Sequence, residues 1–159
     1  MYEASKLLHL VAVVLFLGNI TVGVFWKLFG DRTRDPRIIA HTMAGIIASD
    51  RWFTNPGAIL IVIGGVMAAL LGHYPILRTH WISSSIGLFA LSGAAFGIRL
   101  VPLQRQLLAV SRAGVDGTMD WDRYDQLSGQ WKLWGMVALA APLLAMALMV
   151  LKPGGSPSP

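Results

Sequence analysis

Four long stretches without a charged residue constrain this chain more than any other feature. They cover residues 7–26, 57–72, 81–98 and 133–151. A helix that crosses the hydrocarbon core of a bilayer needs about 20 mostly apolar residues, with about 17 as a lower limit. The second stretch reaches that limit when residues 53–54 and 74–77 are added. The sequence therefore predicts an all-α integral membrane protein with a bundle of four spanning helices.

Composition supports this class and excludes several kinds of redox site. Charged residues make up 13% of the chain, whereas soluble domains carry about 25%. We expect one membrane domain, residues 1–152, followed by a flexible tail of Pro, Gly and Ser at residues 153–159. The absence of cysteine excludes disulfides, zinc–thiolate sites, iron–sulfur clusters and covalently attached c-type haem.

Lys and Arg are distributed unevenly among the connections. The second connection contains only Arg78, whereas the first and third are basic, with Lys27, Arg32, Arg34, Arg37 and Arg51 in the first and Arg99, Arg105, Arg112, Arg123 and Lys132 in the third. Such residues concentrate in cytoplasmic loops. We therefore expect both termini to lie outside the cytoplasm. The same bias explains the net charge of +5, so no nucleic-acid partner is expected.

Capping signals predict further helices in the two basic connections. Asp35 followed by Pro36 is a typical helix start, and the helix that it begins should run to about Trp52. We expect a short additional helix on the cytoplasmic side, with Asn55 starting the second span anew. Asp120 should cap the helix that leads into the fourth span.

The fourth span contains two kinds of helix signal. Trp131 and Trp134 are about one turn apart and predict an aromatic belt at the membrane interface. Pro142 lies near the middle of the span. It should kink the helix unless packing supplies a new partner for the carbonyl that it frees.

One face of the first span carries most of its polar and small side chains. At 100° per residue this face comprises Ser5, His9, Ala12, Phe16, Asn19, Gly23 and Lys27. Polar groups in a membrane need partners, so we expect the face to point into the bundle. Asn19 should form an interhelical hydrogen bond. His9 is either a hydrogen-bonded interior histidine or a ligand of haem iron or copper.

Three of the four histidines should meet at the outer end of the bundle. His73 and His80 flank the short second connection and so reach the same membrane face as His9, which makes the three a candidate metal site. Haem in a helical bundle is held by side chains of facing helices. Lys6 and Arg78 could pair there with haem propionates.

Two further groups of residues are candidates for cofactor contact. Met146 and Met149 lie near the outer end of the fourth span, and thioethers together with imidazoles suit copper. His41 lies on the cytoplasmic side among small residues that a flat ligand or another helix could approach. With His9 and Asn19 it completes the candidate cofactor-binding residues.

The third span is rich in small residues. Gly93 and Gly97 form a G-x-x-x-G pair, which favours close helix packing either within the bundle or in a homodimer. Ser85, Ser92 and Arg99 share one face at seven-residue spacing. The chain has no motif of a hydrolase or ATPase and no carboxylate inside the four apolar stretches, so a proton-driven pump is not expected.

Several strings of the sequence resemble a bacterial family of predicted integral membrane proteins, domain of unknown function 2269. They are KLLHLVAVVLFLGNITVGVFWK, DRTRDPRIIAHT, SDRWFTNPG, LSGAAFGIRLVPLQRQLL and WKLWGMVALAAPLLAMALMVLKP. This resemblance covers nearly the whole chain and implies a four-span protein of the bacterial inner membrane. The family implies no activity.

The segment from Lys6 to Leu10 is more distantly similar to the first span of the membrane-bound, haem-binding protoporphyrinogen oxidase. In that family the histidine of this motif is linked to haem, which implies a haem role for His9. The leading hypothesis is therefore a protein that binds b-type haem or a porphyrin through His9. The alternatives are a non-catalytic subunit or assembly factor of a larger complex and, third, a copper-handling protein.

Overall fold

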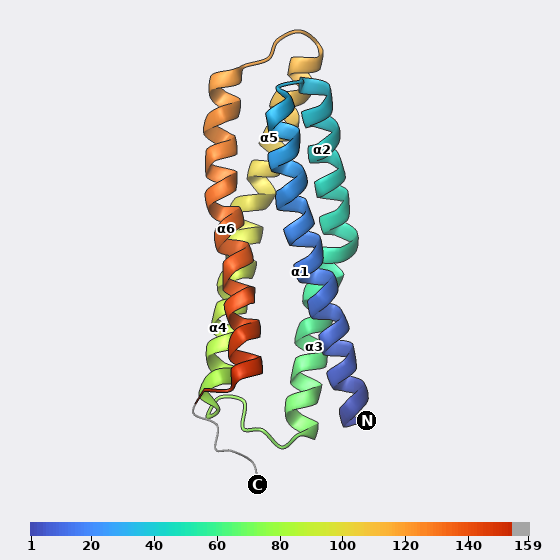
Figure 1. The fold of residues 1–159 in the computed structure, drawn as a ribbon, viewed down its shortest axis with the longest axis vertical. Coiled ribbons are helices and arrows are strands. Elements are labelled where there is room, and N and C mark those ends of the chain that lie inside the picture. Colours follow the sequence, from blue (N-terminus) through green and yellow to red (C-terminus); the bar gives the residue numbers. More distant parts are fainter. Residues whose placement is uncertain (154–159) are drawn as a thin grey trace.

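The computed structural model describes residues 1–153, which form helices joined by short turns without any strand in this range (Figure 1). In chain order the elements are α1 (Tyr2–Thr33), α2 (Pro36–Ser49), η1 (Asp50–Thr54), α3 (Asn55–Leu71), α4 (His80–Ala94), η2 (Ala95–Leu100), α5 (Val101–Val115) and α6 (Trp121–Leu151). They form four continuous rods, each apolar and long enough to cross a membrane. The four-span all-α prediction is confirmed. Residues 154–159 of the predicted tail lie outside the described range.

Two predicted helix starts are present. The carboxylate of Asp35 accepts a hydrogen bond from the backbone N–H of Arg37 at 2.8 Å, and that of Asp120 accepts one from the N–H of Arg123 at 2.9 Å. These side chains satisfy N–H groups that have no acceptor within the first turn of a helix. Local sequence therefore determines where α2 and α6 begin.

The helix predicted after the first span is present as α2, but it is not separate from the second span. α2, η1 and α3 form one helix, Pro36–Leu71. Pro56 lacks an N–H, and in an α-helix its ring would clash with the carbonyl four residues earlier. η1 avoids this break as a π-helical turn, in which the N–H of Asn55 bonds to the carbonyl of Asp50, five residues earlier. The helix therefore passes the proline without ending.

The third rod passes a proline in the same way. η2 is also a π-helical turn, in which the N–H of Val101 bonds to the carbonyl of Phe96, and Pro102 follows directly. α4, η2 and α5 are consequently one helix, His80–Val115. In both middle rods a widened turn immediately precedes the proline.

The rods pack differently at the two ends of the bundle (Figure 1). At one end, which we name the terminal end, lie the start of α1, the end of α6 and the turn between α3 and α4; the turns after α1 and α5 lie at the opposite loop end. In the terminal half α1 packs along α3, and α4 packs along α6. In the loop half α2 packs on α5, which also contacts α6.

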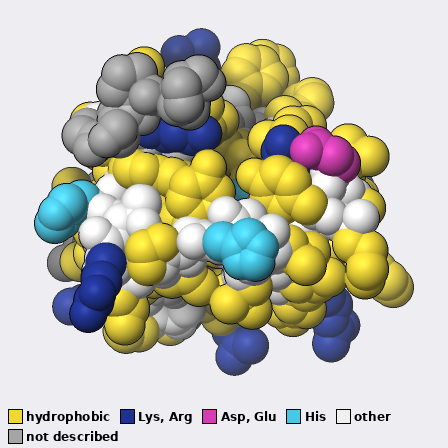
Figure 2. Space-filling model, turned by 90° about the horizontal axis from the view of Figure 1, so that it is seen from below, with side chains coloured by type: hydrophobic (Ala, Val, Ile, Leu, Met, Phe, Trp, Pro, Cys, Tyr) yellow, Lys and Arg dark blue, Asp and Glu magenta, His cyan; other side chains and the backbone are white. Residues whose placement is uncertain are grey.

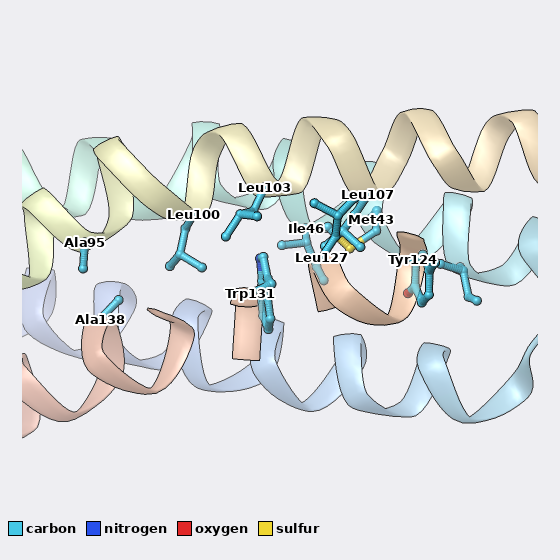
Figure 3. Packing of buried hydrophobic residues seen from close by; sticks show 11 residues of the cluster. Met43, Ile46, Ala95, Leu100, Leu103, Leu107, Tyr124, Leu127, Trp131 and Ala138 are labelled. Atoms are coloured by element: carbon cyan, nitrogen blue, oxygen red, sulfur yellow. The ribbon is translucent and has the colours of Figure 1, made fainter. Parts of the chain in front are cut away.

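The main hydrophobic core lies in the loop half (Figure 3). It consists of Ile39, Met43, Ile46, Ala95, Leu100, Leu103, Leu107, Tyr124, Leu127, Trp131 and Ala138. Trp131 is only 3% exposed, so its predicted place in an interface belt is wrong. The ring packs inside the bundle instead. Trp134 is partly buried, and the guanidinium of Arg99 lies 5.2 Å from its ring centre.

The inward-facing stripe of α1 is confirmed. Ser5, Ala12, Phe16 and Lys27 are buried, and the other three members of the stripe, His9, Asn19 and Gly23, are partly buried. The opposite face of α1 carries many exposed apolar side chains, as a helix in lipid requires. The stripe thus positions all of the polar side chains of α1 that are considered below.

α6 continues through Pro142 because a neighbouring helix satisfies the carbonyl that the proline frees. Pro142 cannot donate to the carbonyl of Ala138, four residues earlier. The hydroxyl of Ser92 on α4 donates to that oxygen at 2.7 Å. The hydroxyl of Ser85 lies 3.1 Å from the carbonyl oxygen of Ala145 and shares its hydrogen with the carbonyl of Trp81 at 2.7 Å. Two buried serines therefore attach α4 to α6 through backbone oxygens.

We expect Ser92→Ala to lower the free energy of unfolding in detergent by about 1 kcal/mol, because the carbonyl of Ala138 loses its donor. In a Pro142→Ala background the N–H of residue 142 replaces that donor, so the same substitution should cost markedly less. Titration with SDS of the wild type, both single variants and the double variant measures this coupling. Equal costs in the two backgrounds would contradict the role of Ser92.

Candidate functional site

A large cleft separates the two helix pairs of the terminal half. Within the described chain no Cα of α3 lies within 8 Å of α4 or α6. The cleft has a volume of about 440 Å³ and is lined mainly by apolar side chains of α1, α3, α4 and α6. Phe16 and Phe89 meet across it with ring centres 5.5 Å apart. Its size lies within the range of about 300–1,000 Å³ that is typical of sites for small molecules.

His9 lines this cleft, and α3 orients its ring. Nδ1 lies 2.8 Å from the carbonyl oxygen of Ile61. A carbonyl only accepts, so Nδ1 carries the hydrogen, and in the neutral form of the ring Nε2 has a free lone pair. Histidines that bind metals usually donate their second nitrogen to a carbonyl or carboxylate in this manner. The ring is therefore prepared to act as an acceptor or ligand through Nε2.

Two glycines of α3 allow the close approach of His9. A Cβ added to Gly64 would lie 3.0 Å from the Cα of His9, and one added to Gly65 would lie 3.0 Å from Cε1 of its ring. Such distances are shorter than ordinary contacts between carbon atoms. The small residues at 64 and 65 are therefore part of the cleft's construction.

Basic and aromatic side chains border the cleft near the terminal end. Lys6 and Lys152 both line it; Lys6 pairs with Glu3 at 3.0 Å, and Lys152 lies 5.6 Å from the ring centre of Trp81. Figure 2 shows this end of the molecule, a mainly hydrophobic surface with scattered Lys and Arg side chains. Arg78, the other predicted partner for propionates, does not line the cleft.

The structure does not gather the three histidines predicted as a metal site. His73 and His80 are exposed and do not line the cleft beside His9, and Figure 2 shows histidines at separate places on the terminal end. Among residues 1–153 no three His, Cys, Asp or Glu side chains form a group that could hold a metal ion. His41 is exposed on α2 in the loop half, away from the cleft.

Two other sets of predicted residues have distinct surroundings. Met146 and Met149 line the same cleft as His9, which places thioethers and an imidazole around one cavity. Gly93 and Gly97 are exposed, and a Cβ at either position would meet nothing within 4 Å. The glycine pair therefore does not pack within the bundle and instead lies on its outer surface.

A second polar site lies where η1 meets α1 and α5. Asp50 is only 8% exposed. Its Oδ1 accepts hydrogen bonds from Nδ2 of Asn19 at 3.2 Å and from the hydroxyl of Thr54 at 2.7 Å, while its Oδ2 accepts one from Nε2 of Gln104 at 2.8 Å. The interhelical hydrogen bond predicted for Asn19 is thus confirmed. All three donors are neutral.

Sequence analysis missed Asp50 and Gln104 because both belong to segments that read as basic surface connections. The available signal was Asn19, an amide inside an uncharged stretch that had to find a partner on another helix. Nothing in the sequence identifies that partner, because Asp50 is 31 residues away along the chain. Only the packing of the rods brings the two together.

A third polar cluster joins α1 to α6 in the loop half. Nζ of Lys27, which is 1% exposed, lies 2.6 and 2.7 Å from the two carboxylate oxygens of Asp31. The hydroxyls of Tyr124 and Ser128 also donate to Asp31. Nζ lies 5.2 Å from the ring centre of Tyr124 and 5.5 Å from that of Trp131. The polar side-chain atoms of Lys27, Asp31, Tyr124 and Ser128 all have hydrogen-bond partners, which favours a structural role.

The rods and their uncharged spans define an integral membrane protein that crosses the bilayer four times, with a cleft and two buried polar clusters inside. The family described as predicted integral membrane protein, domain of unknown function 2269, matches residues 3–153. The chain belongs to this family. Neither a curated protein nor a solved structure matches it.

Proposed function

We propose that the protein lies in a bacterial inner membrane with its terminal end outside the cytoplasm. The turns at the loop end and the helix segments beside them carry most of the Lys and Arg residues, and such residues concentrate on the cytoplasmic side. In this orientation the cleft lies in the outer half of the membrane. A ligand could enter it from the lipid or from the outer surface.

We propose that the cleft binds a flat, apolar and weakly anionic molecule of the haem or porphyrin class, with His9 as its polar anchor. The observation that carries this proposal is the ring of His9, which borders an apolar cavity with Nδ1 already engaged by Ile61. Nε2 would bind the iron of a haem or accept a hydrogen bond from a metal-free porphyrin. Lys6 and Lys152 provide positive charge for carboxylate groups. A bound b-type haem would supply one-electron chemistry, or would itself be the tetrapyrrole that is handled.

The test is an optical spectrum, oxidised and dithionite-reduced, of the full chain purified in detergent from cells with adequate haem supply. We expect a Soret band with α and β bands on reduction, and its loss in His9→Ala. His73→Ala is the matched control and should keep the spectrum, because His73 does not line the cleft. A featureless spectrum of pure, folded protein would overturn the haem proposal. Metal analysis of the same sample tests copper bound by His9, Met146 and Met149.

The second candidate function is a non-catalytic subunit or assembly factor. The exposed Gly93 and Gly97 favour it, because a small-residue face in lipid allows another helix to approach closely. A second copy of this chain is the simplest such partner. The same preparation distinguishes the two functions, since this one predicts a colourless protein that elutes as a dimer, which Gly93→Leu converts to a monomer.

A further inference from the structure

The carboxyl group of Asp50 is buried without a positive charge beside it. Within the described residues it takes part in no ion pair, and only the three neutral donors of Asn19, Thr54 and Gln104 contact it. An ionised carboxylate out of water is costly unless it is paired with a charge or fully hydrogen-bonded. Two hydrogen bonds reach Oδ1 but only one reaches Oδ2. Oδ2 therefore has room for one more partner.

A small cavity lies next to this carboxyl group. It has a volume of about 20 Å³ and is lined by residues of six elements, among them Asn19, Asp50, Gln104 and Trp131. A cavity needs about 10–15 Å³ to hold one water molecule, together with two to four polar partners. Both conditions are met here. The space is large enough for one water molecule and too small for an organic ligand.

Trp131 supplies an independent sign that the cavity is occupied. Its Nε1 is buried and is the one buried side-chain nitrogen or oxygen in residues 1–153 that has no hydrogen-bond partner. Figure 3 shows the nitrogen of Trp131 directed towards the helix that carries Leu100 and Leu103; Leu100 also lines the cavity, and Gln104 follows Leu103 on α5. An indole N–H only donates, so a water molecule in the cavity would satisfy it.

We propose that Asp50 and this cavity form a buried proton-binding site, in which one water molecule links the N–H of Trp131 to Oδ2 of Asp50. When the carboxyl group is ionised, the water accepts from Trp131 and donates to Oδ2. When a proton arrives from bulk water, it forms the O–H bond of the carboxylic acid, and the cavity water accepts from that O–H instead. The site takes up one proton, which brings one positive charge. The O–H bond is the only covalent bond that changes.

The charged groups near Asp50 form no ion pair with it, so Asp50 is itself the group that takes up a proton at this site. On α1 the nearest charge of the inward stripe is Lys27, eight residues beyond Asn19 and paired with Asp31. Arg51 on η1, Arg99 on η2 and Arg105 on α5 are exposed. On α6 the neutral Trp131 lines the cavity, and Nζ of Lys132 lies 3.6 Å from Asp31. None of these charges forms an ion pair with Asp50.

The test is infrared difference spectroscopy of the full chain in lipid nanodiscs between neutral and acidic pH. The wild type should show a carbonyl band of a protonated, buried carboxylic acid that is absent from Asp50→Asn. Asp116→Asn is the matched control and should keep this band, because Asp116 is exposed in the turn after α5. Wild-type and Asp50→Asn spectra that agree in this region would overturn the proposal.

Two variants that retain Asp50 keep the test decisive if Asp50→Asn fails to fold. Gln104→Leu removes a donor to the charged form, so the midpoint of the band should move to higher pH by about one unit, a tenfold gain in proton affinity. Trp131→Phe removes the N–H that holds the water, together with the five-membered ring that carries it, and should shift the frequency of the band. An unchanged midpoint in the first variant or an unchanged frequency in the second would contradict the site as described. The result is independent of whether the terminal cleft binds a tetrapyrrole.

Discussion

Asp31→Ala should lower the free energy of unfolding by about 3–5 kcal/mol, because it leaves the ammonium group of Lys27 buried without its counter-ion. Lys27 is only 1% exposed, and Tyr124 and Ser128 would lose their acceptor in the same substitution. Removal of one partner from a buried ion pair costs far more than removal of both. Thermal or SDS unfolding in detergent measures the loss.

The double variant Lys27→Met, Asp31→Leu should recover most of that stability, because apolar side chains of similar size can replace a buried ion pair. Asp125→Ala serves as the control, because Asp125 forms an exposed ion pair with Arg34 and such pairs contribute little. A small loss in Asp31→Ala, similar to that in Asp125→Ala, would mean that Lys27 reaches water more easily than its burial indicates.

Gly64→Leu should lower the free energy of unfolding by about 1–3 kcal/mol, because the added side chain collides with the backbone of His9 and forces α1 away from α3. The same displacement should break the hydrogen bond between Nδ1 of His9 and Ile61. Nitrogen NMR of histidine-labelled protein reports this change, since it distinguishes a ring nitrogen that carries a hydrogen from one that does not.

Gly18→Leu is the matched control for that substitution. Gly18 lies on α1, and a Cβ there would meet nothing within 4 Å, so leucine should point outward and change neither stability nor the spectrum of His9. If Gly64→Leu behaved like Gly18→Leu, the contact of α1 with α3 would be loose enough to absorb a full side chain. The orientation of His9 would then need another explanation.

Features that depend on local sequence could be predicted. The uncharged stretches identify four spans, and Asp35 and Asp120 mark helix starts correctly. The stripe of α1 faces inward as its periodicity requires, so His9 and Asn19 were correctly placed inside the bundle. Each of these features follows from hydropathy, capping or helical period over fewer than about 30 residues.

Features that depend on packing between helices could not be predicted. The partners of Asn19 lie on η1. Asp50 in turn accepts a hydrogen bond from Gln104, which lies 54 positions further along the chain. Trp131 looks like an interface residue in sequence but fills the core, because residues of α2, η2 and α5 form one buried cluster with it in the loop half. Pairings of this kind depend on how far each rod is shifted along its neighbours, and hydropathy contains no information on that shift.

The π-helical turns also change which residues of the two middle rods lie on the same face. A π turn takes up one residue more than an α turn, so the residues beyond it are rotated by about 100° relative to an unbroken α-helix. Ser85 and Ser92, seven residues apart, are both buried, yet Arg99, seven residues further and inside η2, is exposed. Each middle rod therefore consists of two helical segments that are out of phase, and a heptad pattern read from one half points to the wrong side of the other.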